Sequence, residues 1–249
     1  MISLGHLDAN IVTHCNYRCA SCSHAAPVSD VWQMSPEELA ADLARLSKVV
    51  HFQRIQMVGG EPTLHKNIVD MMMVSRASGI ANEVMVITNG SRLKQMPELF
   101  WQELDTLQLS IYPKLDPEIP AFAAHKCQQH GKPFYSTIYT DFHQQLRATP
   151  NDGAHFATCH WKSDCYTVHR GRFLLCPQSA FFPQNFMGLP EGIDGLSLDD
   201  LTEEKFSAFL NRKEPLNACR ICCANEMKSK PWAEAKGREE WVAGSTLST

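Results

Sequence analysis

Three cysteines stand close together in residues 14–24, at the spacing C-x3-C-x2-C: Cys15, Cys19 and Cys22. A closed structural metal site takes four protein ligands, whereas a cubane [4Fe–4S] cluster held by three thiolates leaves one iron open to a small molecule. A loop this short lets the three cysteine sulfurs converge on one face of the loop. The spacing therefore favours a cluster that binds a ligand through its fourth iron. The alternative is a zinc loop with His24 as the fourth ligand.

A second motif ends an apolar run at residues 57–62, where Gly59 and Gly60 are followed by Glu61 and Pro62. Glycine lets the backbone approach a ligand closely. Glu61, or the exposed main chain beside it, is a candidate to hold a ligand ammonium group. Zinc binding has no need for such a segment, so this motif argues against the zinc alternative.

With both motifs in this order, the chain resembles the radical SAM enzymes over about residues 8–140. In that family the cysteine loop follows the first strand and the GGEP segment follows the second. The resemblance implies an open (β/α)6 barrel and a [4Fe–4S] cluster whose open iron chelates the amino and carboxylate groups of S-adenosylmethionine (SAM). It also implies that residues 59–62 hold the SAM amino group. Many members carry an aromatic residue just before the third cysteine, where this chain has Ser21.

Strands and helices are expected to alternate along the first 140 residues. Ser35, Pro36 and Glu38 form a helix start with a capping box, and apolar residues repeat at helical spacing up to Val50. Strands are predicted at 10–13, 54–58, 83–87, 107–112 and 133–140, and later helices at 68–78, 97–104, 117–130 and 202–212. This order predicts an α/β fold with a parallel sheet and right-handed crossovers. The partial (β/α)6 barrel that the resemblance implies fits this count if one further strand follows.

Ligands bind at the carboxyl ends of the strands in such folds, and every candidate motif falls there. By resemblance, Asn89 and Ser110 contact the ribose or methionyl part of SAM. The alternative is that Asn89 belongs to an ordinary turn and Ser110 is a strand-end hydroxyl. Tyr17, inside the cysteine loop, has either a structural role or a role in covering the cluster or touching substrate.

A second group of cysteines follows residue 150. Residues 165–176 are expected to form a β-hairpin that turns at Arg170 and Gly171. This turn would place Cys165 and Cys176 opposite each other, with Cβ atoms about 5 Å apart. The remaining cysteines of the group lie outside the hairpin: Cys159, Cys219, Cys222 and Cys223.

This second group resembles the twitch or SPASM extension of radical SAM enzymes, because Gly171-x4-Cys176 and the late C-x2-C at residues 219–222 match its pattern. The resemblance implies one auxiliary [4Fe–4S] cluster, with residues 1–150 as the barrel and 151–249 as the auxiliary region. The family spacing favours Cys159 as first ligand and the hairpin favours Cys165, so both stay open. The choice between Cys222 and Cys223 also stays open, and a structural zinc site is the alternative.

Composition excludes several classes of protein. The net charge of −4 and pI of about 6.2 give no basic field for nucleic acid. No apolar run is long enough to span a membrane, so no membrane partner is expected. Ten cysteines without an export signal favour metal or cluster ligation over disulfides. We expect a cytoplasmic protein.

The resemblance implies an enzyme that cleaves SAM to a 5′-deoxyadenosyl radical, which removes a hydrogen atom from the substrate. The compact barrel-plus-twitch size is similar to that of the radical SAM dehydrogenases of aminocyclitol biosynthesis. We therefore expect a small polar substrate, such as a sugar, cyclitol or nucleoside, oxidised at a carbinol carbon, and a flavodoxin- or ferredoxin-type electron donor. The alternatives are a peptide maturase, an epimerase that uses a cysteine thiol, and a non-enzymatic zinc-binding module. The sequence identifies no catalytic acid or base.

Overall fold

The computed structural model describes residues 1–246. Its strands are β1 (Ile2–Val12), β2 (Val50–Gly59), β3 (Ala81–Thr88), β4 (Thr106–Ile111), β5 (Phe134–Ile138), β6 (Asp141–His143), β7 (Tyr166–His169), β8 (Arg172–Leu174), β9 (Leu196–Ser197) and β10 (Ser229–Pro231). Its α-helices are α1 (Pro36–Leu46), α2 (Ile68–Ala77), α3 (Glu98–Glu103), α4 (Ile119–Gln129), α5 (Pro177–Met187), α6 (Glu203–Leu210) and α7 (Arg238–Ser245). None of the helices within residues 1–246 is both long and apolar enough to cross a membrane.

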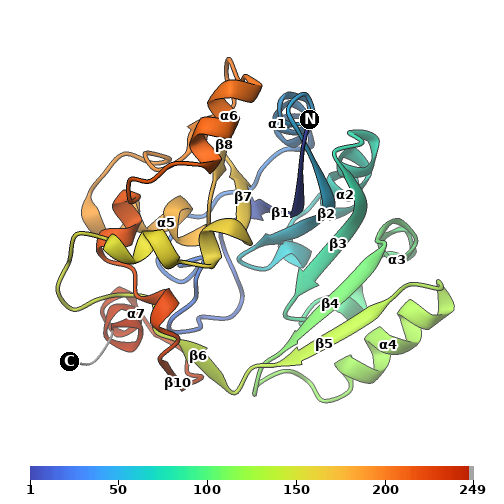
Figure 1. The fold of residues 1–249 in the computed structure, drawn as a ribbon. Coiled ribbons are helices and arrows are strands. Elements are labelled where there is room, and N and C mark those ends of the chain that lie inside the picture. The colour runs from blue at the N-terminus through green and yellow to red at the C-terminus, as the bar shows by residue number, and fades with distance from the viewer. Residues whose placement is uncertain (247–249) are drawn as a thin grey trace.

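One sheet organises the molecule, with the strand order β5-β4-β3-β2-β1-β7-β8-β9. Strands from β5 to β7 run parallel to their neighbours, and β8 and β9 are antiparallel additions. Helices α1 to α4 lie along the outer side of this fan of strands, and the later part of the chain gathers beside β1 and β7 (Figure 1). The α/β architecture with a parallel sheet, predicted from the alternation of elements, is confirmed.

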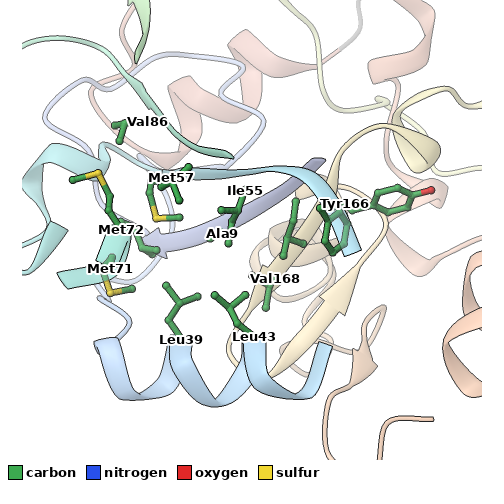
Figure 2. Close-up of a cluster of buried hydrophobic side chains, with 14 of the residues drawn as sticks. Ala9, Leu39, Leu43, Ile55, Met57, Met71, Met72, Val86, Tyr166 and Val168 are labelled. Carbon is green, nitrogen blue, oxygen red and sulfur yellow. The ribbon is translucent and has the colours of Figure 1, made fainter. Parts of the chain in front are cut away.

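The first helix shows how local sequence sets the fold. Ser35 caps α1: its hydroxyl accepts the Glu38 N–H at 3.1 Å, and the Glu38 carboxylate accepts the Ser35 N–H at 2.7 Å. This is the predicted capping box. Leu39 and Leu43 then point toward the sheet and pack against residues such as Ile55 (Figure 2). The helix ends at Leu46 rather than at Val50, which begins β2.

The one further parallel strand that was predicted is present as β7. The short β6, which comes before it in the chain, pairs with β10 in a separate two-stranded sheet. The parallel position is filled by β7, which pairs with the free edge of β1. Without β7 that edge would leave buried backbone N–H and C=O groups unpaired. Residues after 150 therefore share the sheet and the main apolar core with the first half.

The predicted hairpin is present as β7 and β8. Arg170 and Gly171 have φ values of 46° and 69°, as a two-residue type I′ turn requires. The paired ladder extends only from Thr167 and Leu174 to the turn. It stops short of Cys165 and Cys176, because Cys176 becomes the N-cap of α5. The predicted cross-strand pairing therefore does not extend to these two cysteines.

Candidate active site

The cysteine loop leaves β1 at its carboxyl end, and its sulfurs accept several N–H groups. Cys15 Sγ accepts the Tyr17 N–H at 3.3 Å, and Cys19 Sγ accepts the indole N–H of Trp232 at 3.1 Å. Backbone N–H groups that follow Cys22 are directed at its sulfur. Such donors favour a thiolate over a thiol and are typical of sulfurs that bind iron.

Burial acts against the thiolate at all three positions when no metal is bound. It is the main cause that raises the pKa of Cys15, Cys19 and Cys22, with Cys19 at about 12, and the charge of Cys22 adds to the rise at the other two. Three buried thiols this close together are stable as thiolates only when a cation compensates their charge. The loop is therefore suited to an iron–sulfur cluster.

Gly59 and Gly60 allow the end of β2 to approach the start of the cysteine loop. A Cβ at Gly60 would lie 2.0 Å from the His14 carbonyl oxygen, and one at Gly59 would lie 2.0 Å from that of Val12. Gly59 also has a φ of 138°, a conformation that favours glycine. The glycines thus serve first to pack backbone against the cysteine loop. This contact fixes Cys15 relative to the motif on the next strand.

The Glu61 carboxylate is buried and already has its hydrogen bonds. Oε1 accepts the Thr63 N–H at 3.0 Å and the hydroxyls of Thr63 and Thr88, each at 2.5 Å, and Oε2 accepts the Asn89 N–H at 2.7 Å. Glu61 therefore anchors the loops after β2 and β3. Of the two predicted ways to hold an ammonium group at this motif, the geometry favours the main chain.

The other predicted SAM-contacting residues converge on the same place. The Asn89 amide donates to Cys15 Sγ at 3.6 Å and to Asn16 Oδ1 at 3.0 Å. The Tyr17 ring packs edge-on against Tyr112, with centroids 5.6 Å apart, and lies under the Lys114 ammonium. Asn89, Tyr17 and Ser110 line one cavity, whereas Pro62 is buried at the start of a short 3-10 turn behind it.

This cavity has a volume of about 390 Å³ and lies at the carboxyl ends of the central strands. The three loop cysteines, Gly59, Gly60, Glu61 and Cys165 line it. Its lining, drawn from residues 1–246, includes the carboxylates of Asp8 and Glu61 but neither lysine nor arginine. A neutral or cationic ligand suits such a site better than a polyanion.

Asp8 is a cavity residue that the sequence analysis missed. It pairs in register with Gln56 on β2 and Thr167 on β7, so polar residues of three adjacent strands share one row. The side chain is 8% exposed, and its Oδ1 has no hydrogen-bond partner among residues 1–246. Burial, followed by the charge of Asp164, raises the Asp8 pKa to about 7. A buried carboxylate without a partner is costly unless a ligand supplies one.

In the second group of cysteines, the pKa values of Cys176 and Cys222 are raised by burial and by the charges of other cysteines. Burial, then the charges of Cys219 and Cys159, raise the Cys176 pKa to about 12. Burial also raises the pKa of Cys222, with contributions from Cys176, Cys219 and Cys223. Helix α5, which Cys176 caps, packs against the 3-10 turn at residues 217–220 that contains Cys219. The charges of Cys159 and Cys219 thus act on Cys176, and those of Cys176 and Cys219 act on Cys222.

Cys165 and Cys223 have different surroundings. After burial, the strongest influences that raise the pKa of Cys165 are Asp8 and Asp164, ahead of Cys176 and Cys159. Burial and then the charge of Glu226 raise the pKa of Cys223, whereas the charges of Arg147 and Lys228 lower it. These surroundings differ from those of Cys176 and Cys222, whose pKa is raised, after burial, mainly by other cysteines.

The cysteine arrangement can be compared with the zinc alternatives. Within the described part of the chain, no three Cys, His, Asp or Glu side chains are close enough to hold a single metal ion. A tetrahedral zinc would bring its sulfurs to within roughly 3.8 Å of one another. A cubane cluster holds its cysteines farther apart, so the two kinds of site differ in the sulfur spacing that they need.

Comparison with known proteins agrees with this geometry. Residues 9–112 match the family model described as "Radical SAM superfamily". Similar proteins include the "Probable GTP 3',8-cyclase" of Thermococcus kodakarensis, 29% identical over 116 residues that cover 46% of this chain and 36% of that protein. The mitochondrial GTP 3',8-cyclase of Arabidopsis thaliana is 31% identical over 120 residues, which cover 47% and 30%. The chain spans about a third of the length of these curated relatives.

A solved structure shares the fold over more of the chain. The structure of BtrN in complex with AdoMet and 2-DOIA superposes with a TM-score of 0.55 at 16% identity, covering 84% of this chain and 83% of that one. BtrN in an open conformation gives a TM-score of 0.50. The family match covers residues 9–112, which contain the cysteine loop and the Gly59–Pro62 segment, and it identifies this part of the chain as a radical SAM domain.

Proposed function

We propose that the chain is a radical SAM dehydrogenase that oxidises a carbinol carbon of a small polar molecule, such as a sugar, cyclitol or nucleoside. In this proposal Cys15, Cys19 and Cys22 hold the SAM-binding [4Fe–4S] cluster. The main chain of residues 59–62 binds the SAM amino group, and Asn89, Ser110 and Tyr17 complete the SAM site. When bound, the cluster and SAM supply the 5′-deoxyadenosyl radical that removes a hydrogen atom from carbon. A flavodoxin- or ferredoxin-type protein is the proposed electron donor.

The observation that carries the proposal is the position of the second cysteine set beside the cavity. Cys176 directly precedes Pro177, which lines the cavity with the three loop cysteines. We assign Cys159, Cys176, Cys219 and Cys222 as ligands of an auxiliary [4Fe–4S] cluster, in a region that extends from residue 151 to 249. A cluster held by these residues would supply an acceptor for one electron, which a two-electron oxidation of the substrate requires.

Asp8 is the proposed proton acceptor. Oxidation of a carbinol to a carbonyl removes a hydrogen atom from carbon, a proton from oxygen and one electron. Asp8 would accept the proton, whereas SAM and the auxiliary cluster, when bound, would supply the acceptors for the hydrogen atom and the electron. The unpartnered Oδ1 supports this role because a substrate hydroxyl would supply its missing hydrogen bond. Cys165, left outside the proposed ligand set, lines the same cavity.

The curated relatives are named for a reaction of GTP, but the cavity gives little support for a triphosphate ligand. The cavity-lining residues in the described chain include no cationic side chain apart from histidine. Phosphates are usually bound by Arg, Lys or a metal ion. The acidic lining instead favours a neutral polyol or an amine, which supports the proposed substrate class.

The second candidate is a redox-neutral epimerase, favoured by the position of Cys165. A thiol in the cavity is placed to return a hydrogen atom to the opposite face of a substrate radical. The test is to incubate reconstituted protein, SAM and dithionite with a panel of cyclitols, aminocyclitols, sugars and nucleosides in D2O. We expect one carbonyl product for each deoxyadenosine formed. Deoxyadenosine without a carbonyl product, accompanied by solvent deuterium on carbon, would favour the epimerase.

A further inference from the structure

The segment after β10 lies across the cysteine loop. Cys19 and Glu234 form an isolated antiparallel bridge. The Ala20 N–H donates to the Ala233 carbonyl at 2.9 Å, and the Ala235 N–H donates to the Arg18 carbonyl at 2.8 Å. Three consecutive residues, 233–235, are thus paired with the loop that carries the proposed cluster ligands. This pairing fixes the position of Trp232 relative to Cys19.

Trp232 directs its indole N–H at a proposed cluster ligand. Nε1 lies 3.1 Å from Cys19 Sγ. The ring stacks with Tyr112, with centroids 6.2 Å apart and planes 28° apart, so it is held from a second side. Cys19 is only 7% exposed. The hydrogen bond therefore lies where water competes little for the sulfur.

We propose that Trp232 sets the reduction potential of the cluster held by Cys15, Cys19 and Cys22, by donating a hydrogen bond to the Cys19 thiolate. One-electron reduction adds negative charge that is shared with the ligand sulfurs. A donor at the sulfur stabilises the reduced cluster more than the oxidised one and so raises the potential. Trp232 is a positioning residue, since it acts through Cys19. The proposal rests on the cluster assignment in the proposed function and is independent of the substrate.

The test is an EPR-monitored redox titration of the full chain after anaerobic reconstitution. The relevant signal is the one that changes when SAM is added. In Trp232→Phe, we expect the ratio of reduced to oxidised cluster to fall roughly fivefold at the wild-type midpoint, equivalent to about 40 mV for a one-electron couple. Trp241→Phe is the matched control, because the buried Trp241 indole N–H has no partner in residues 1–246. An unchanged midpoint in Trp232→Phe would overturn the proposal.

A second measurement begins with unaltered protein, where a negative result does not depend on how a variant folds. Protein grown with indole-¹⁵N tryptophan should show a ¹⁵N coupling in the pulsed EPR spectrum of the SAM-responsive cluster. The coupling should persist in Trp241→Phe and be absent from Trp232→Phe. A SAM-responsive cluster without any ¹⁵N coupling in wild type would reject the role of Trp232. The absence of any SAM-responsive cluster would instead reject the cluster assignment itself.

Discussion

Replacing Cys222 with alanine is expected to lower the iron content of the reconstituted chain from about eight to about four atoms. Cys223→Ala should leave about eight. The two residues are adjacent, and burial raises the pKa of both. After burial, the charges of Cys176 and Cys219 raise the pKa of Cys222, whereas Cys223 responds to Glu226, Arg147 and Lys228. Removal of one thiolate leaves a cubane cluster with three protein ligands. We expect such a cluster to be lost from a site without a replacement ligand.

Iron and acid-labile sulfide per chain, measured after gel filtration, check this result. Cys159→Ala and Cys165→Ala provide a second matched pair, with loss of about four irons expected only for Cys159. The variants that lack the auxiliary cluster should still cleave SAM but form no carbonyl product. Retention of eight irons in Cys222→Ala together with a loss in Cys223→Ala would reverse the assignment.

Replacing Asp8 with asparagine is expected to reduce carbonyl formation by a factor of at least about 100, because the substrate hydroxyl loses its proton acceptor. The amide has nearly the same size and cannot accept the proton. Deoxyadenosine formation should persist, since Asp8 is not assigned to the SAM site. Initial rates of both products, for a compound from the panel that wild type oxidises, check this separation. Equal loss of both products would contradict a role confined to proton transfer.

The pH dependence provides a second test of Asp8. Its pKa is raised to about 7, mainly by burial and then by Asp164. Because the base must be ionised, carbonyl formation should rise with pH through about 7. Asp164→Asn removes the nearby charge from an exposed position, lowers the Asp8 pKa and should move the profile to lower pH. A profile that does not respond to this control would exclude Asp8 as the titrating group.

The first half of the fold is predictable because each local signal agrees with the global arrangement. The capping box of α1 and the turn at Arg170 and Gly171 are both present in the structure. The position of β7 depends on the unpaired edge of β1, with which it pairs. That pairing joins distant parts of the chain, so no local sequence pattern predicts it. Helix α5 was not predicted, since Pro183 lies inside it, and neither was the polar helix α7.

The same distinction applies to the site. Spacing identified the loop cysteines and residues 59–62 because their partners are close in sequence or on the next strand. Spacing could not show that the Glu61 carboxylate already accepts hydrogen bonds from Thr63, Thr88 and Asn89. Asp8 had a signal that was overlooked: polar His6, Asp8 and Asn10 alternate with apolar residues along β1. The contact between Trp232 and Cys19 joins residues 213 positions apart and depends on tertiary structure alone.

The most direct test of the whole account is iron and sulfide per chain in wild type and in a Cys15/Cys19/Cys22→Ala variant, both reconstituted anaerobically. We predict about eight irons in wild type and about four in the variant, with SAM cleavage only in wild type. About four irons that fall to none would show that the later cysteines hold no cluster. That result would remove the electron acceptor on which the proposed dehydrogenation depends.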